Sequence, residues 1–67
     1  MKQIDYDKEV DILTIQFADE AVIESDEIYP QVIADYNATG EIIRIEILHF
    51  STFKGLATLS SILPSAL

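Results

Sequence analysis

The sequence predicts an α+β domain in which two similar hairpins form a four-stranded antiparallel β-meander, with a C-terminal helix packed on one face. Three observations predict this fold. A chain of 67 residues has room for one hydrophobic core. Apolar and polar residues alternate with the period of a strand in the first part of the chain, and apolar residues recur at helical spacing near its end. We therefore treat residues 1–67 as a single domain, with the β-meander in 1–50 and the C-terminal helix and tail in 51–67.

An internal repeat supports the two hairpins. The segment DYDKEVDILTIQF, residues 5–17, aligns without a gap with DYNATGEIIRIEI, residues 35–47, at an offset of thirty. The aligned identities are Asp5 with Asp35, Tyr6 with Tyr36, Ile12 with Ile42, and Ile15 with Ile45. Both copies alternate after the turn, as half-buried strands do.

The second hairpin has the clearer turn. Its residues 37–40, Asn-Ala-Thr-Gly, fit a type I turn in which Gly40 takes a positive φ. Asp35 and Asn37 are expected to stabilise this turn by accepting hydrogen bonds from nearby backbone N–H groups. We expect Ala34 to pair with Ile43 across the two strands.

This register sorts the side chains onto two faces. One face collects Val32, Ala34, Tyr36, Ile43, Ile45 and Ile47, joined by Ile4, Tyr6, Leu13, Ile15 and Phe17 of the first hairpin. The other face carries the mostly polar set Gln3, Asp5, Thr14, Gln16, Asp35, Arg44 and Glu46. A shift of one residue would bury three charged side chains, so the register above is favoured.

The remaining segments complete the predicted fold. The acidic residues 18–30 are expected to connect the hairpins, with Pro30 preventing regular pairing. Ser51 can cap the C-terminal helix and Pro64 ends it. Its apolar face is predicted to hold Phe53, Leu56, Leu59, Ile62 and Leu63. Gly55 costs such a helix ~1 kcal/mol and leaves its start undefined.

Residues 35–46 also spell an EF-hand calcium loop. Asp35, Asn37 and Thr39 stand at ligand positions, Gly40 at the turn position and Glu46 at the closing position. A true EF-hand loop lies between helices, whereas both flanks here alternate as strands. Glu46 would lie about 20 Å along the strand at ~3.4 Å per residue. We therefore predict a hairpin turn and no metal site. The acidic residues of the first turn are expected to be solvated. Weak binding of a divalent cation by such acidic turns is the third functional hypothesis.

Composition limits the functional classes. Twelve acidic and four basic residues give a formal charge of −8, which disfavours nucleic acid and anionic membranes and favours a basic protein partner. The chain has no Cys and a single His, His49, and no spacing indicates a catalytic triad or a cofactor site. We expect a cytoplasmic protein that is not an enzyme and carries no cofactor.

Four aliphatic residues interrupt the polar face of the predicted sheet: Ile12, Ile33, Ile42 and Leu48. Apolar side chains on a polar face often mark an interface. A small core without disulfide or metal also favours oligomerisation. We therefore predict a self-associating interaction module, most simply a dimer. The alternative is an acidic, antitoxin-like partner of a basic toxin-like protein.

The pattern IDYDKEVDILTIQF, followed by DYN--GEIIRIEIL-F-S, resembles a group of very small prokaryotic proteins, the domain of unknown function 2283 family. The resemblance covers residue 4 to about residue 51. It implies a small β-rich fold and transfers no activity, cofactor or catalytic residue. The chain departs from the family at Pro30-Gln31, where Pro-Gly is common, and in its longer C-terminal tail.

Overall fold

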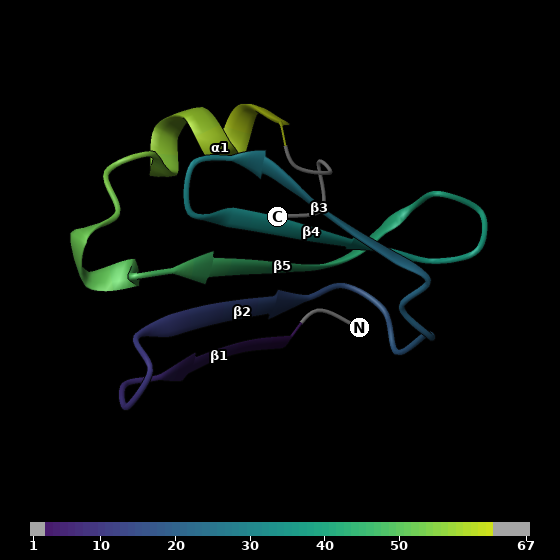
Figure 1. Ribbon diagram of the computed structural model, residues 1–67, viewed down its shortest axis with the longest axis horizontal. Helices are drawn as coiled ribbons and strands as arrows, with labels where there is room; N and C mark the ends of the chain where they lie inside the picture. The colour runs from purple at the N-terminus through teal and green to yellow at the C-terminus, as the bar shows by residue number, and fades with distance from the viewer. Residues whose placement is uncertain (1–2, 63–67) are drawn as a thin grey trace.

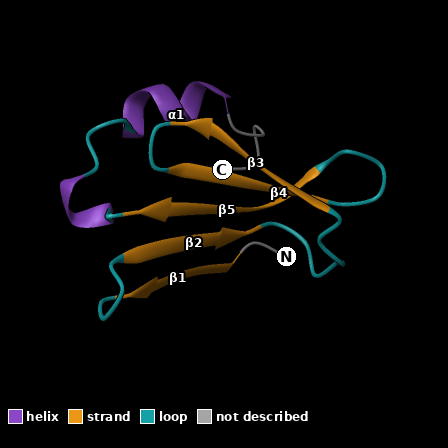
Figure 2. Ribbon diagram, in the orientation of Figure 1, coloured by secondary structure: helices purple, strands orange, loops and turns teal. Residues whose placement is uncertain are grey.

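The computed structural model describes residues 3–62 of the protein, except for the side chain of Ile62. These residues form one five-stranded antiparallel sheet, a 3-10 helix and a short α-helix (Figures 1 and 2). The elements are β1 (Gln3–Asp7), β2 (Ile12–Gln16), β3 (Glu24–Tyr29), β4 (Val32–Tyr36), β5 (Ile42–Leu48), η1 (Phe50–Thr52) and α1 (Leu56–Ile62). The predicted α+β class is confirmed.

The sheet departs from the predicted four-stranded meander in two ways. The acidic segment predicted as a connection contains β3, which pairs with the outer edge of β4. The strand order is β1-β2-β5-β4-β3, so β5 lies between β2 and β4. The segment ESDEIY hides β3 from pattern analysis, because an edge strand with acids on both faces lacks the alternation of a half-buried strand.

The repeat is present in the strand pairing. Equivalent pairs at the offset of thirty are Gln3–Gln16 and Ile33–Glu46, Ile4–Ile15 and Ala34–Ile45, and Asp5–Thr14 and Asp35–Arg44. The predicted pairing of Ala34 with Ile43 is wrong by two residues, because the turn is longer than expected and the register shifts between Asp35 and Tyr36. An even shift keeps the paired side chains on their predicted faces, except for Ile42 beyond the register shift, which packs against the core.

β2 and β5 join the two hairpins about a pseudo-two-fold axis. Ile15 opposes Ile45, and these positions are each other's equivalents in the repeat. To one side of this pair Leu13 opposes Ile47. To the other side the Phe17 N–H donates to the Ile43 carbonyl at 2.8 Å. Exchanging the hairpins therefore preserves the arrangement β1-β2-β5-β4, whereas β3 has no counterpart beside β1 among residues 3–62.

The core lies between the sheet and α1. It consists of the buried residues Ile15, Val32, Ala34, Ile45, Ile47 and Leu59. The predicted apolar face is thus confirmed for the strands of the second hairpin. In the first hairpin Ile4 and Tyr6 remain 60% and 45% exposed. Figure 1 shows the reason, since α1 lies toward β3 and β4 and away from β1.

The α-helix begins later than Ser51 predicts. Ser51 lies in η1, where its N–H and Oγ donate to the Asp11 carboxylate at 3.1 and 2.6 Å. The first helical hydrogen bond of α1 runs from the Leu59 N–H to the Gly55 carbonyl at 2.8 Å. Leu59 enters the core as predicted, while Leu56 is exposed. Leu63 and Pro64 lie outside the described residues.

The turns at the two ends of β4 each place a residue at positive φ. Gly40 has φ 83°, as predicted. Gln31 has φ 71° and follows Pro30 in the turn between β3 and β4. This is the position where a glycine would be free of strain. Two hydrogen bonds to Leu48 hold Gln31 in this conformation. The side-chain amide of Gln31 donates to the Leu48 carbonyl at 2.7 Å, and the main-chain carbonyl of Gln31 accepts the Leu48 N–H at 2.8 Å.

Gly55 is required by packing. A Cβ at this position would lie 2.6 Å from Cε2 of Tyr29 and 2.9 Å from Cζ of Phe53. We predict that Gly55→Ala lowers the free energy of unfolding by about 1–3 kcal/mol through overpacking, measured by urea denaturation. An unstrained Gly→Ala change would instead stabilise the protein by about 0.4–1 kcal/mol. Adding Phe53→Leu should recover part of the loss, and strictly additive effects would contradict the clash.

Candidate functional site

The side of the sheet opposite α1, here called the outer face, carries the predicted polar side chains. Cross-strand pairing arranges them in rows across the strands. One row runs through Gln16, Arg44, Asp35 and Ser25, and the next through Thr14, Glu46, Ile33 and Glu27. At the end of β2 and β5, Ile12 opposes Leu48. The outer face therefore combines a charged row with an aliphatic end.

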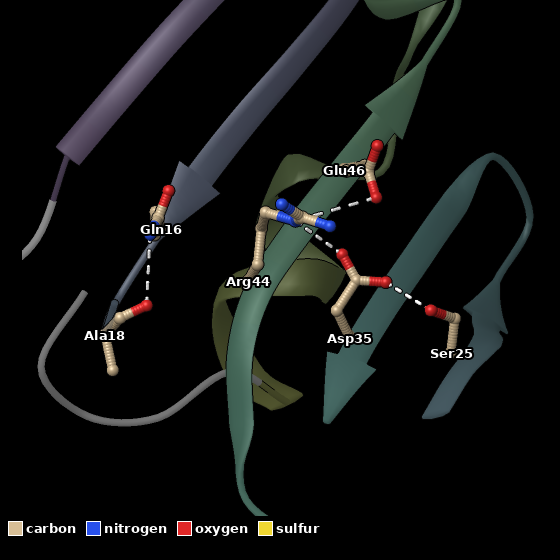
Figure 3. Close-up of polar contacts among 6 residues, drawn as sticks. All are labelled: Gln16, Ala18, Ser25, Asp35, Arg44 and Glu46. Atoms are coloured by element: carbon tan, nitrogen blue, oxygen red, sulfur yellow. Dashed lines mark hydrogen bonds and ion pairs between the residues drawn. The ribbon is translucent and has the colours of Figure 1, made fainter. Parts of the chain in front are cut away.

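Asp35 is the centre of the charged row, as Figure 3 shows. Its Oδ1 accepts a hydrogen bond from Ser25 Oγ at 2.5 Å, and its Oδ2 accepts one from Arg44 Nε at 2.7 Å. Glu46 Oε2 lies 3.8 Å from the same Arg44 nitrogen. The Gln16 amide turns away and donates to the Ala18 carbonyl at 3.2 Å. Three strands thus converge on one carboxylate.

The position of Asp35 differs from the prediction. It lies within β4 and not in the turn, and it is only 1% exposed, although it belongs to the polar face. The burial is tolerated because both carboxylate oxygens have donors, one of them charged. Ser25 comes from β3, the strand that the sequence pattern did not reveal. No sequence signal marked Ser25 as a partner of Asp35.

The two carboxyl groups beside Arg44, those of Asp35 and Glu46, have pKa values shifted in opposite directions. Burial raises the pKa of Asp35, but the hydrogen bonds from Ser25 and Arg44 outweigh it and hold the pKa below its usual value. Burial, together with the neighbouring Asp35 charge, raises the pKa of Glu46. The hydrogen bond to Asp35 raises the pKa of Arg44. At neutral pH Asp35 and Arg44 therefore form an ion pair. The ionised form of Glu46 is the one that its surroundings disfavour.

The segment 35–46, which matches the EF-hand sequence pattern, forms the hairpin between β4 and β5. The Asn37 side-chain oxygen accepts the Thr39 N–H at 3.1 Å and the Glu41 N–H at 2.9 Å, which confirms its predicted role in the turn. The same oxygen also accepts the Thr39 hydroxyl at 2.9 Å. Asn37 is thus engaged in the turn, while Asp35 is engaged in its ion pair within β4. Among residues 3–62, no three His, Asp or Glu side chains are grouped to hold a metal ion.

The first turn is built differently, around Asp11. This residue has φ 57°. Its carboxylate accepts hydrogen bonds from the Tyr6 hydroxyl at 2.6 Å and from Ser51. The bonds from Ser51 and then Tyr6 lower the pKa of Asp11, and the bond to Asp11 raises the pKa of Tyr6. Asp11 thus fastens the first hairpin to η1, a role that the sequence analysis missed.

The four predicted interface residues are split by the fold. Ile12 and Leu48 lie directly opposite each other, and Ile33 lies diagonally next to Leu48, since Ile33 opposes Glu46. We call Ile12, Ile33 and Leu48 the aliphatic patch. Each is half-buried. Ile42 lies beyond Arg44 at the other end of β5 and packs against the core, so it is not part of the patch.

A separate open groove of about 610 Å³ lies at the opposite end of β4. Its lining is formed by residues 23–26 at the start of β3 and by residues 36–40 of the turn. Neither Glu46 nor His49 lines it. The carboxyl group with the raised pKa, that of Glu46, therefore lies outside this groove. Within the described part of the chain, no helix is long and apolar enough to cross a membrane.

A single antiparallel sheet, covered by one helix and displaying a mixed polar and aliphatic outer face, defines a small two-layer α+β protein. The chain belongs to the DUF2283 family, described as a protein of unknown function, which it matches over residues 3–51. The match includes all five strands and ends before α1. No curated protein and no solved structure is significantly similar to it.

Removing the central carboxylate tests the charged row. We predict that Asp35→Ala lowers the free energy of unfolding by about 1–3 kcal/mol at pH 7, because it leaves buried space and unpaired donors. The matched control is Asp5→Ala, at the equivalent repeat position, which is exposed and should change stability by less than about 0.5 kcal/mol. The pKa of Asp35 is lowered on folding, so the difference from the natural protein should shrink as the pH falls through that pKa. Equal effects of both variants would contradict this assignment.

Glu46 provides a test of opposite sign. Its pKa is raised on folding, so its ionisation opposes folding: the cost begins above the usual glutamate pKa and is complete above the raised pKa. We predict that Glu46→Gln stabilises the protein at pH 7–8 and that the gain disappears as the pH falls below the usual glutamate pKa, measured by urea denaturation. Glu27→Gln, an exposed change in the same row, is the matched control and should change stability at pH 7 by less than about 0.5 kcal/mol. A destabilised Glu46→Gln at pH 7 would contradict the analysis.

Proposed function

We propose that the protein is a non-enzymatic interaction module that self-associates through the outer face of its sheet. The observation that carries the proposal is the contiguity of the aliphatic patch. Three half-buried aliphatic side chains from β2, β4 and β5 adjoin on a face that α1 does not cover. Sheet faces of this kind pack against each other about 10 Å apart. A second copy presents the same patch, as a two-fold dimer requires.

The local charge of this region is compatible with self-association. The total charge of −8 is screened beyond about 8 Å at physiological ionic strength, so nearby groups decide. Asp35 is neutralised by Arg44, and Thr14 and Gln31 beside the patch are uncharged. Glu46 and Glu27 flank Ile33, so the interface must leave these two carboxylates at its solvated rim.

The carboxyl chemistry favours binding over catalysis. Asp35 has both oxygens bonded and a lowered pKa, which is the reverse of what a general acid needs. Glu46 has a raised pKa but lies on an open sheet face, outside the groove. General acid–base chemistry needs a pocket that holds the substrate against such a group.

The proposal is tested by placing a charge in the patch. We predict that the natural protein sediments as a dimer at about 50 μM and that Leu48→Lys sediments as a monomer, since an unpaired ammonium cannot be buried in an aliphatic interface. Val10→Lys is the matched control, because Val10 is equally aliphatic but lies in the first turn and is 56% exposed. It should leave the dimer intact. Thermal melting shows whether each variant folds.

Two results would count against the outer face. A natural protein that remains monomeric at about 50 μM would contradict self-association. A dimer that survives Leu48→Lys but dissociates when residues 64–67 are deleted would move the interface to the C-terminal tail.

A further inference from the structure

The open edge of β1 is the least protected part of the sheet. β1 ends the strand order, and within residues 3–62 no strand pairs with its outer side. Its five residues are all exposed, and its pairing with β2 has no irregularity. The pseudo-two-fold axis relates β1 to β4, whose outer edge is occupied by β3. The position beside β1 is therefore the one that a strand fills in the other half of the molecule.

The side chains of β1 leave an apolar surface next to this edge. Ile4 and Tyr6 point to the core side of the sheet but are 60% and 45% exposed. Their repeat equivalents, Ala34 and Tyr36, are buried and half-buried. The ring of Tyr6 packs against that of Phe50, with ring centroids 5.7 Å apart. An incoming strand could cover both side chains.

The other side of β1 is acidic. Asp5 and Asp7 are exposed there, and Glu9 follows in the turn. Residues opposite each other in an antiparallel pair lie about 4.5–5.5 Å apart, well inside the screening length. A second copy of β1 would bring like charges together at that distance. A strand with basic side chains would meet Asp5 and Asp7 with favourable charge.

β3, the other edge, lacks these features. Glu24 and Asp26 oppose Tyr36 and Ala34, so its core side carries acids where β1 has apolar residues. Its register also shifts between Glu27 and Tyr29. Inward charges and bulges are ways in which proteins protect a sheet edge from pairing. The two edges are therefore not equivalent as acceptors.

We propose that β1 is an acceptor edge for an extended segment of another protein, in which Lys or Arg alternates with aliphatic residues. The segment would add an antiparallel strand beside β1, as in known strand-addition complexes. Its aliphatic residues would cover Ile4 and Tyr6, and its basic residues would lie over Asp5 and Asp7. The acids that prevent self-pairing thus select the partner.

The experiment uses the full chain and a synthetic peptide of about seven residues alternating Lys and Val, long enough to span β1. A peptide of the same composition, with its Lys residues in one block, is the control. We expect saturable binding of the alternating peptide in the range of about 0.1–1 mM at physiological salt, with amide-exchange protection gained in β1. The block peptide should bind at least about ten-fold more weakly, because it cannot present one charged face and one apolar face.

A matched pair of variants locates the site. Asp5→Lys with Asp7→Asn keeps the acceptor that Asp7 offers to the Glu9 N–H and reverses the charge of the edge. It should weaken peptide binding by about ten-fold or more. Glu24→Lys with Asp26→Asn makes the same charge change on β3 and should leave binding unaltered. Repeating the titration in Leu48→Lys separates this result from the proposed self-association.

Three results would overturn the proposal. One is the absence of saturable binding. Another is equal binding of the two peptides, with protection spread over the acidic surface. The last is a dimer of the natural protein in which protection is gained along β1, because that would identify a second copy as the occupant.

Discussion

The pairing of β2 with β5 is the interaction on which the rest of the structure depends. A single two-stranded hairpin is at best marginally stable in water, and each repeat alone would be one. Joining them at Ile15 and Ile45 produces a continuous apolar surface wide enough for α1 to cover. Every buried residue of the core cluster except Leu59 belongs to the strands β2, β4 and β5. Without this junction the aliphatic patch would not exist, since Ile12 lies on one side of it and Leu48 and Ile33 lie on the other.

The two halves of the sheet differ in how much of each is buried. The second hairpin is enclosed by β3 and α1, and its Asp35 became a buried ion-paired residue. The equivalent Asp5 remained on the surface. The turns diverged as well: one is organised by an Asn side chain, and the other by an Asp that holds η1. Enclosure buries the second hairpin, while β1 of the first hairpin stays exposed.

Pattern analysis recovered what depends on local alternation. The two faces, the two hairpins and Gly40 follow from period two and from the repeat, and an error of two residues in register does not disturb the faces. What failed depends on long-range contacts. β3 was missed because acidic side chains lie on both of its faces, so its sequence has no alternation of polar and apolar residues. The burial of Asp35 depends on Ser25, ten residues away on that unseen strand. Ile42, the first residue of β5, packs against the core because it lies beyond the register shift between Asp35 and Tyr36.

The topology also has a consequence for the rate of folding. Strands β2 and β5 pair residues that are separated by nearly half of the chain, for example Ile15 and Ile45. Hairpins form in about 1–10 μs, but a contact of this length carries a large loop-closure cost before any core is gained. Joining the hairpins is therefore the step expected to limit the rate, and β3 lies in the loop that must close. Once β3 is paired with β4, the free part of that loop is reduced to the residues between β2 and β3. The strand least visible in the sequence therefore lowers the closure cost of the longest-range pairing in the sheet.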